Sequence, residues 1–101
     1  MALSSDQMLE ALKVVHDPEI GINIVDLGLV YEVNVDDAGK AKVLYTLTSV
    51  GCPAGAQIDS DIKNAITGME GVSEVETEVT MTPPWGPDKM SEFARSALGF
   101  F

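Results

Sequence analysis

Two alternating segments joined by a tight turn constrain the fold of this chain more than any other feature of its sequence. Apolar residues recur at every second position on both sides of the turn: Leu29, Tyr31, Val33 and Val35 before it, and Val43, Tyr45 and Leu47 after it. A period of two is typical of strands with one buried face, and Asp36, Asp37 and Gly39 supply the turn chemistry between them. The sequence therefore predicts a β-hairpin.

Three further segments carry apolar residues at the spacing of an amphipathic helix. The first helix is predicted over about residues 6–15, with Ser5 or Asp6 as its N-terminal cap. The second follows Pro53 and should end at Gly68, which we expect to adopt a positive φ as the C-terminal cap. The third helix closes the chain. The apolar positions are Met8, Leu9, Leu12 and Val15 in the first helix, Ile58, Ile62, Ala65 and Ile66 in the second, and Met90, Phe93, Ala94, Ala97 and Leu98 in the third.

Residues 72–81 predict a third strand, because apolar or small side chains alternate there with glutamates. The inward positions are Val75, Thr77, Val79 and Met81, and the outward positions are Glu74, Glu76 and Glu78. The predicted order α-β-β-α-β-α describes a small two-layer α+β sandwich, a three-stranded mixed sheet with helices on one face. We expect residues 1–101 to form a single domain.

The charge of the chain restricts its partners. Sixteen acidic against six basic residues give a formal net charge of -10, which repels phosphate backbones and anionic bilayers. The first residues lack the pattern of a secretory signal, and no apolar run approaches the roughly 18 residues of a membrane span. We therefore expect no nucleic-acid partner, no membrane partner and a cytoplasmic location.

Cys52 is the only cysteine in the sequence, and it lies at the predicted turn between the second strand and the second helix. With Pro53 as the first helical residue, Cys52 would be the N-cap, where backbone N–H groups favour a thiolate. A free cysteine at such a turn is equally well explained as a small buried hydrophobe, so its position leaves both interpretations open. One cysteine and one histidine cannot supply the four ligands of a structural zinc site.

Three blocks of the sequence carry a resemblance to a known family: HDPEIGINIVDLGLVYEV, LTSVGCP and PPWGPDKMSEFARSALGF. In this order they resemble the metal-sulfur (iron-sulfur) cluster assembly family, also called domain of unknown function fifty-nine, which includes SufT-like and PaaD-like proteins. The resemblance implies a fold similar to the C-terminal scaffold domain of NifU-type proteins. It also implies a non-enzymatic role in iron-sulfur cluster assembly, as a carrier or targeting factor that acts on apo-proteins.

The same resemblance assigns site residues. It makes Cys52 the candidate ligand of a cluster or metal, and it places Asp17, Glu19, Thr48 and Ser49 in a shared pocket. It implies a transient, labile iron-sulfur cluster with no tightly bound cofactor, and it names the iron-sulfur assembly machinery and apo-protein clients as partners. Because a single thiol is too few for a stable cluster, we expect a monomer or a weak homodimer.

The pocket residues also have ordinary structural explanations. Asp17 and Glu19 flank Pro18 in an extended corner, where carboxylates often cap backbone N–H groups. Thr48 and Ser49 could hydrogen-bond a thiolate or satisfy the backbone where the strand ends. Local chemistry alone favours the structural explanation for all four.

Two other polar or aromatic residues are assigned to the fold. Asp26 precedes Gly28 and is expected to shape a turn. Trp85 lies in a proline-rich loop and is expected to plug the core. Burial is also the default for Phe100 and Phe101 at the end of the sequence.

Two other functions compete with the assembly role. One is a cysteine enzyme in which His16 activates Cys52 and Asp17 or Asp26 orients the imidazole. The other is a protein-interaction module with an inert Cys52.

Overall fold

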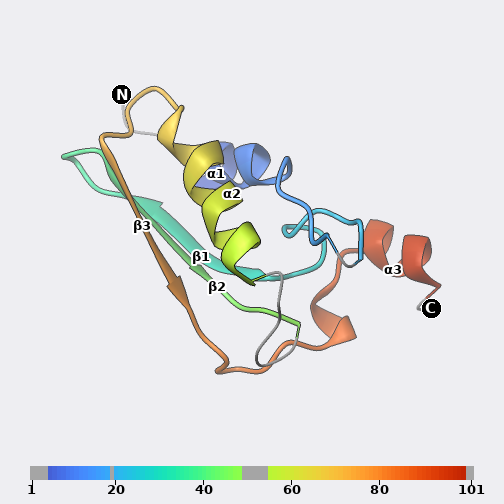
Figure 1. Ribbon diagram of the computed structural model, residues 1–101. Coiled ribbons are helices and arrows are strands. Elements are labelled where there is room, and N and C mark those ends of the chain that lie inside the picture. The colour runs from blue at the N-terminus through green and yellow to red at the C-terminus, as the bar shows by residue number, and fades with distance from the viewer. Residues whose placement is uncertain (1–4, 19, 49–54, 100–101) are drawn as a thin grey trace.

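The chain forms two layers, a three-stranded sheet and two helices packed on one of its faces (Figure 1). The computed structural model describes residues 5–18, 20–48 and 55–99. The elements are α1 (Ser5–Leu12), β1 (Val30–Val35), β2 (Lys40–Tyr45), α2 (Gly55–Thr67), β3 (Glu74–Val79), the 3-10 turn η1 (Pro87–Lys89) and α3 (Glu92–Leu98). The strand order is β1-β2-β3, with β1 antiparallel and β3 parallel to β2. This confirms the predicted α+β fold class and element order.

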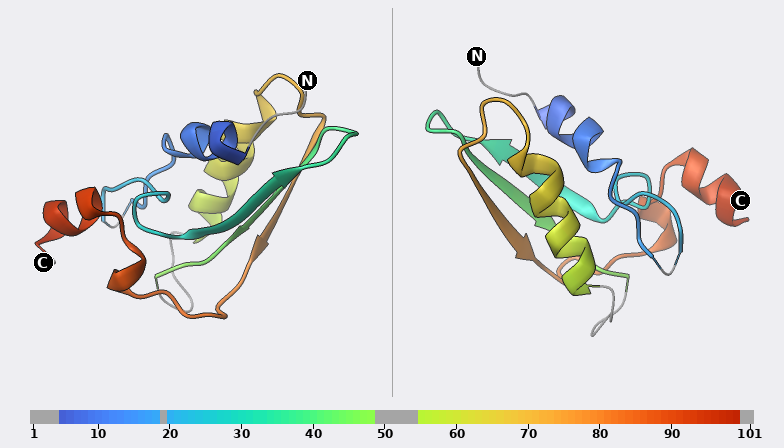
Figure 2. Two further views of the ribbon diagram at one scale, coloured as in Figure 1. Left: turned by 180° about the vertical axis from the view of Figure 1, so that it is seen from behind. Right: turned by 45° about the horizontal axis from the view of Figure 1, so that its top comes forward.

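The core lies between the sheet and the helices α1 and α2 (Figure 2). Ile58, Ile62 and Ile66 form the stripe that α2 buries, and all three are fully buried. Met8 and Leu12 do the same for α1, as the helical spacing predicts. Within the described ranges, none of the helices combines the length and the apolar character that crossing a membrane requires.

Two helices differ from their predicted bounds. Helix α1 ends at Leu12 rather than near residue 15, because the next residues form a tight turn in which the amide of Val15 donates to the carbonyl of Leu12 at 3.0 Å. Helix α3 begins after Ser91, whose side chain accepts a hydrogen bond from the amide of Ala94 at 3.2 Å. Met90 therefore precedes α3, and Phe93 is exposed at 64% of its surface.

The prediction for Gly68 is wrong in its backbone conformation. Helix α2 does end before this glycine, but Gly68 does not have a positive φ. The positive φ falls instead on Gly71, at 93°, where the chain reverses toward β3. The last turn of α2 carries a local bond from the hydroxyl of Thr67 to the carbonyl of Lys63 at 2.5 Å. A Gly68→Val substitution therefore has no left-handed strain to introduce.

The alternation in β1 breaks at Tyr31. The register of β1 with β2 shifts between Val30 and Glu32, so that Tyr31 is the extra residue. Its hydroxyl donates to the carbonyl of Pro83 at 2.7 Å, and its side chain lies against the groove described below, away from the core cluster. The period of two placed Tyr31 with Val33 on the inner face, and the bulge is the reason that this placement is wrong.

The chain after β3 packs against the turn that precedes β1. The indole N–H of Trp85 donates to the carbonyl of Leu27 at 2.6 Å, and the half-buried ring packs against the core. The amide of Ser91 donates to the carbonyl of Asp26 at 2.8 Å. The backbone at Lys89 approaches Gly28 so closely that a Cβ on this glycine would overlap the Lys89 carbonyl. The predicted packing of Trp85 against the core is confirmed, with the side chain at the border of the core and only partly buried.

We predict that Gly28→Ala destabilises the protein much more than Gly21→Ala. Both glycines have a positive φ, 79° and 83°, so each substitution costs about 1 kcal/mol of backbone strain. Only Gly28 has backbone in the space of the new methyl group, which adds roughly 2 kcal/mol of overpacking. Urea unfolding of the two variants measures the difference. Equal losses in the free energy of unfolding for the two variants would mean that the methyl group at residue 28 does not clash with the Lys89 backbone.

Candidate functional site

The segment that carries Cys52 connects the end of β2 to the start of α2. Because β2 and β3 are parallel, their carboxyl ends meet at one edge of the sheet, and the connection leaves from that edge (Figure 1). The amide of Thr80, directly after β3, donates to the carbonyl of Tyr45 at 2.8 Å and extends the pairing to the last residue of β2. The turn predicted to hold the thiol is therefore built on the ends of two paired strands.

Several predicted site residues lie outside the described residues. These are Glu19, Ser49, Cys52 and its neighbour Pro53, together with the closing Phe100 and Phe101. Of the pocket residues that are described, Thr48 is half-buried in a bend after β2 and Asp17 is only 1% exposed. The shared pocket of these residues with Cys52 stays a prediction.

Thr46 anchors the chain just before this connection. It is fully buried, and its amide donates to the carbonyl of Leu29 at 2.7 Å. Its hydroxyl donates to the thioether sulfur of Met81 at 3.7 Å, which links the chain after β2 to the chain after β3. The carboxyl ends of β2 and β3 are thus held together where the connection to α2 begins.

The start of α2 is held against the same edge by contact with Leu47. A Cβ built on Gly55 would lie 3.1 Å from the Cδ1 atom of Leu47, so the first turn of α2 and the strand end are in close approach. A glycine at this position allows the helix start to sit near the strand end. Gly55 at the start of α2 and Leu47 after the end of β2 are therefore in close approach.

A polar cluster ties the second turn of α2 to both parallel strands. The hydroxyls of Tyr45, on β2, and Thr77, on β3, donate to the same Asp59 oxygen at 2.8 and 2.6 Å. Lys63, one turn later, lies 3.1 Å from the other oxygen. Tyr45 is 3% exposed, so this is a hydrogen bond between a buried donor and a carboxylate.

The titration behaviour of the cluster follows from this geometry. Burial alone would raise the pKa of Asp59, but the hydrogen bonds from Thr77 and Tyr45 and the ammonium of Lys63 outweigh it and hold the pKa below its ordinary value. Burial, and then the bond to the Asp59 carboxylate, raise the pKa of Tyr45 above its usual range. Asp59 therefore stays ionised as the acceptor, and Tyr45 stays protonated as the donor.

Asp17 closes a short loop between α1 and β1. Its amide donates to the carbonyl of Ile22 at 3.0 Å, and its own carbonyl accepts from the amides of Ile20 and Gly21 at 3.2 and 2.6 Å. His16 and Asn23 form an isolated antiparallel bridge across the same loop. These are main-chain contacts, and they place the buried Asp17 in a rigid turn.

His16 and Asp26, which the enzyme hypothesis pairs, each contact another group in the described structure. His16 is exposed, and its Nδ1 atom lies 3.1 Å from the carbonyl oxygen of Val14. The Asp26 carboxylate accepts from the Asn23 amide at 2.6 Å, while the Asp26 amide donates to the Asn23 side chain at 2.9 Å. The hydrogen bond from Asn23, and then one from Ser91, hold the pKa of Asp26 below its ordinary value. Asp26 shapes the turn, as predicted.

No three histidine, cysteine, aspartate or glutamate side chains within residues 5–18, 20–48 and 55–99 are grouped so that they could hold a metal ion. The described side chains between α2 and the ends of the parallel strands are hydroxyls, a thioether, apolar groups and the Asp59 carboxylate with Lys63.

The chain is thus a small α+β domain in which the only cysteine of the sequence lies between β2 and α2. The family model described as iron-sulfur cluster assembly protein matches residues 5–83. The chain belongs to this family, as the sequence resemblance predicted.

The chain is similar to named relatives over nearly all of their length. It is 49% identical over 86 residues to the Fe-S protein maturation auxiliary factor SufT of Staphylococcus aureus (strain USA300), a match that covers 85% of this chain and 98% of the relative. It is 43% identical over 94 residues to the Fe-S protein maturation auxiliary factor YitW of Bacillus subtilis (strain 168), with 93% and 92% covered.

A solved structure shares the fold. The crystal structure of a domain of unknown function DUF59 from Bacillus anthracis superposes with a TM-score of 0.90 at 41% identity, over 95% of this chain and 92% of that chain. The architecture derived from the elements of this chain is therefore the architecture of its family.

We predict that Tyr45→Phe destabilises the protein by about 2 kcal/mol, because it removes a buried bond to an ionised carboxylate. The matched control is Tyr31→Phe, which removes an exposed bond to a carbonyl and should cost about 0.5 kcal/mol. The pKa of Asp59 is lowered on folding, so the stabilisation is present above the unfolded pKa near 4 and is lost as the pH falls through the folded pKa.

Urea unfolding at pH 7 and at pH 3 measures both effects. The difference in the free energy of unfolding between Tyr45→Phe and the wild-type protein should shrink at the lower pH. The corresponding difference for Tyr31→Phe should not change. Equal losses for the two variants at pH 7 would show that the Asp59 cluster does not hold α2 to the sheet.

Proposed function

We propose that this protein is a non-enzymatic maturation factor for iron-sulfur proteins, which acts on apo-proteins as a carrier or targeting factor through Cys52. The observation that carries the proposal is the family match over residues 5–83, a range that includes the cysteine. The two relatives described above are named maturation auxiliary factors, and these names favour an auxiliary role in assembly over a catalytic one.

The chemistry of Cys52 suits a transient bond between its thiolate and iron. A thiolate is the soft ligand that iron-sulfur clusters use, and such clusters normally take four cysteines or a mixed set with histidine. The sequence offers one cysteine and one histidine. A cluster handled by this protein is therefore cargo with an incomplete set of ligands, and the missing ligands come from a client, a small thiol or a second copy.

The described residues contribute position rather than chemistry to this role. Thr46 and the Asp59 cluster fix the strand ends and the helix start between which Cys52 lies in the sequence. Asp17, Glu19, Thr48 and Ser49 remain the proposed pocket around it.

The net charge of -10 acts on association. Two copies that share a cluster through their Cys52 thiols must overcome mutual repulsion, which salt screens over about 10 Å at 0.1 M. The apo-protein is accordingly proposed to be a monomer, and a cluster-bridged dimer would be labile and favoured by higher ionic strength. Its working partners are the iron-sulfur assembly machinery and apo-protein clients.

We predict that Cys52→Ala folds normally but does not support iron-sulfur enzymes in cells. The loss of one small sulfur and a cap should cost no more than about 2 kcal/mol of stability. The assay is the activity of an iron-sulfur enzyme in a strain that lacks the endogenous gene and expresses the variant. The matched control is Ser60→Ala, an exposed change on α2 that should support full activity.

The amounts of both variants in the cells are compared by immunoblot, so that a loss of protein is not read as a loss of function. Full enzyme activity with Cys52→Ala at equal protein level would contradict the role given to the cysteine.

A further inference from the structure

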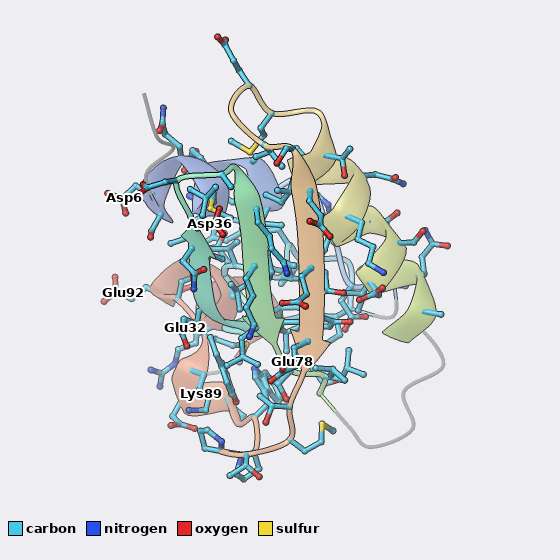
Figure 3. The ribbon with its side chains drawn as sticks, turned by 90° about the vertical axis from the view of Figure 1, so that its left-hand side faces the viewer. Asp6, Glu32, Asp36, Glu78, Lys89 and Glu92 are labelled. Atoms are coloured by element: carbon cyan, nitrogen blue, oxygen red, sulfur yellow. The ribbon has the colours of Figure 1, made fainter. Side chains whose placement is uncertain are left out.

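The face of the sheet opposite α1 and α2 is not covered by any described helix (Figure 3). Along β2 this face carries Leu44 between charged neighbours. Leu44 is paired in register with Glu32 on β1 and with Glu78 on β3, so the apolar side chain has a carboxylate on each side. Because strands lie about 4.8 Å apart, the three side chains form one row across the sheet.

Leu44 also lines an open groove of about 620 Å³ at one end of this face. The floor and walls are mostly apolar and come from four separate parts of the chain: Val25, Gly28, Val30, Tyr31, Leu44, Thr82, Pro83 and Lys89. A second hollow of about 260 Å³ shares Leu44 as a lining residue and is otherwise lined by Glu32, Asn34, Lys42 and Glu78. We call these two hollows together the Leu44 groove.

The walls of the Leu44 groove are rigid. The β1 bulge turns Tyr31 toward it, and the Tyr31 hydroxyl is bonded to the carbonyl of Pro83. The ammonium of Lys89 lies 5.3 Å from the centre of the Tyr31 ring. The close approach of Gly28 to Lys89 fixes the far wall. The groove is thus preformed, which lowers the entropic cost of binding.

The lining of the groove carries charges of both signs. Glu32 and Glu78 line one of the two hollows together with Lys42, and Lys89 lines the other. Figure 3 labels Glu32, Glu78 and Lys89 among the side chains. Within the described ranges Glu32 makes no ion pair, and Glu78 is paired only with Lys42, at 4.0 Å between exposed side chains. Such an exposed pair is weak, so a stronger cationic partner can replace it.

We propose that the Leu44 groove is a docking site for a partner-protein segment in which an apolar side chain is flanked by arginine or lysine. The apolar side chain packs on Leu44, Val30 and Pro83, and the cations face Glu32 and Glu78. A second copy of this chain is disfavoured as the occupant, because its sequence holds six basic against sixteen acidic residues. Four of those six, Lys13, Lys40, Lys42 and Lys63, already contact carboxylates.

This site goes beyond the proposed function, since its binding chemistry involves neither Cys52 nor a metal. It gives the protein a means to select a partner by shape and charge. With the carboxylates of Glu32 and Glu78 beside its apolar centre, on a chain of net charge -10, the groove prefers basic segments to acidic ones.

The test is an NMR titration of the full chain with a blocked pentapeptide, Gly-Arg-Leu-Arg-Gly. We expect amide shift changes confined to the residues that line the groove. Affinity should fall about fivefold in the double variant Glu32→Gln/Glu78→Gln, since each lost contact is of the strength of an exposed ion pair. The matched control, Glu70→Gln/Glu92→Gln, removes the same charge from exposed positions outside the groove and should bind as the wild-type protein does.

Two further peptides separate the groove from general charge attraction. Gly-Arg-Ser-Arg-Gly should bind more weakly because it lacks the apolar side chain, and Gly-Glu-Leu-Glu-Gly should not bind. The proposal is overturned by the absence of binding, by shift changes spread over the other faces, or by equal losses in the two double variants. Equal binding of the three peptides would overturn it too. Cys52→Ala should bind the first peptide unchanged, so failure here leaves the proposed function untouched.

Discussion

The hydrogen bonds to the carboxylate of Asp59 are the interaction on which the arrangement of α2 against β2 and β3 depends. The carboxylate receives hydroxyl donors from Tyr45 and Thr77, so a single side chain of α2 joins both strands of the parallel pair. The isoleucine stripe of α2 supplies more free energy, yet apolar packing is not directional and allows small shifts of a helix over a sheet. The hydrogen bonds restrict the position of α2 along the strands, and with it the position of Gly55, where the helix begins.

Most of the fold could be predicted from the sequence because its strongest signals are periodic. The hairpin, the buried face of α2 and the acidic outer row of β3 follow from spacings of two and of three to four residues. The departures have local causes that periodicity does not encode. The bulge at Tyr31 reverses one side chain, the turn after α2 places the positive φ at Gly71 rather than Gly68, and the Ser91 cap shortens α3.

Some features of the candidate site could likewise be predicted from the sequence, and others could not. Cys52 stays a predicted site residue, because it is the only cysteine in the sequence, lies between β2 and α2, and is surrounded by blocks that resemble the family to which the chain belongs. Asp59 was missed, although a polar residue beside the apolar stripe of α2, opposite Tyr45 and Thr77 on inward strand positions, is the signal that could have found it. The Leu44 groove combines four distant segments, which only the fold brings together. In the two proposals, Cys52 and the Leu44 groove are separate features of the molecule.

The central claim, that this protein acts on iron-sulfur clients through Cys52, is tested most directly by the activation of an apo-enzyme in vitro. The purified protein is added anaerobically to the apo form of a [4Fe–4S] dehydratase with a cluster donor, before and after iodoacetamide treatment. Alkylation modifies only Cys52, because it is the only cysteine in the sequence. The account predicts that the untreated protein accelerates activation and that the alkylated protein, still folded by circular dichroism, does not. Equal acceleration by the alkylated protein would contradict it.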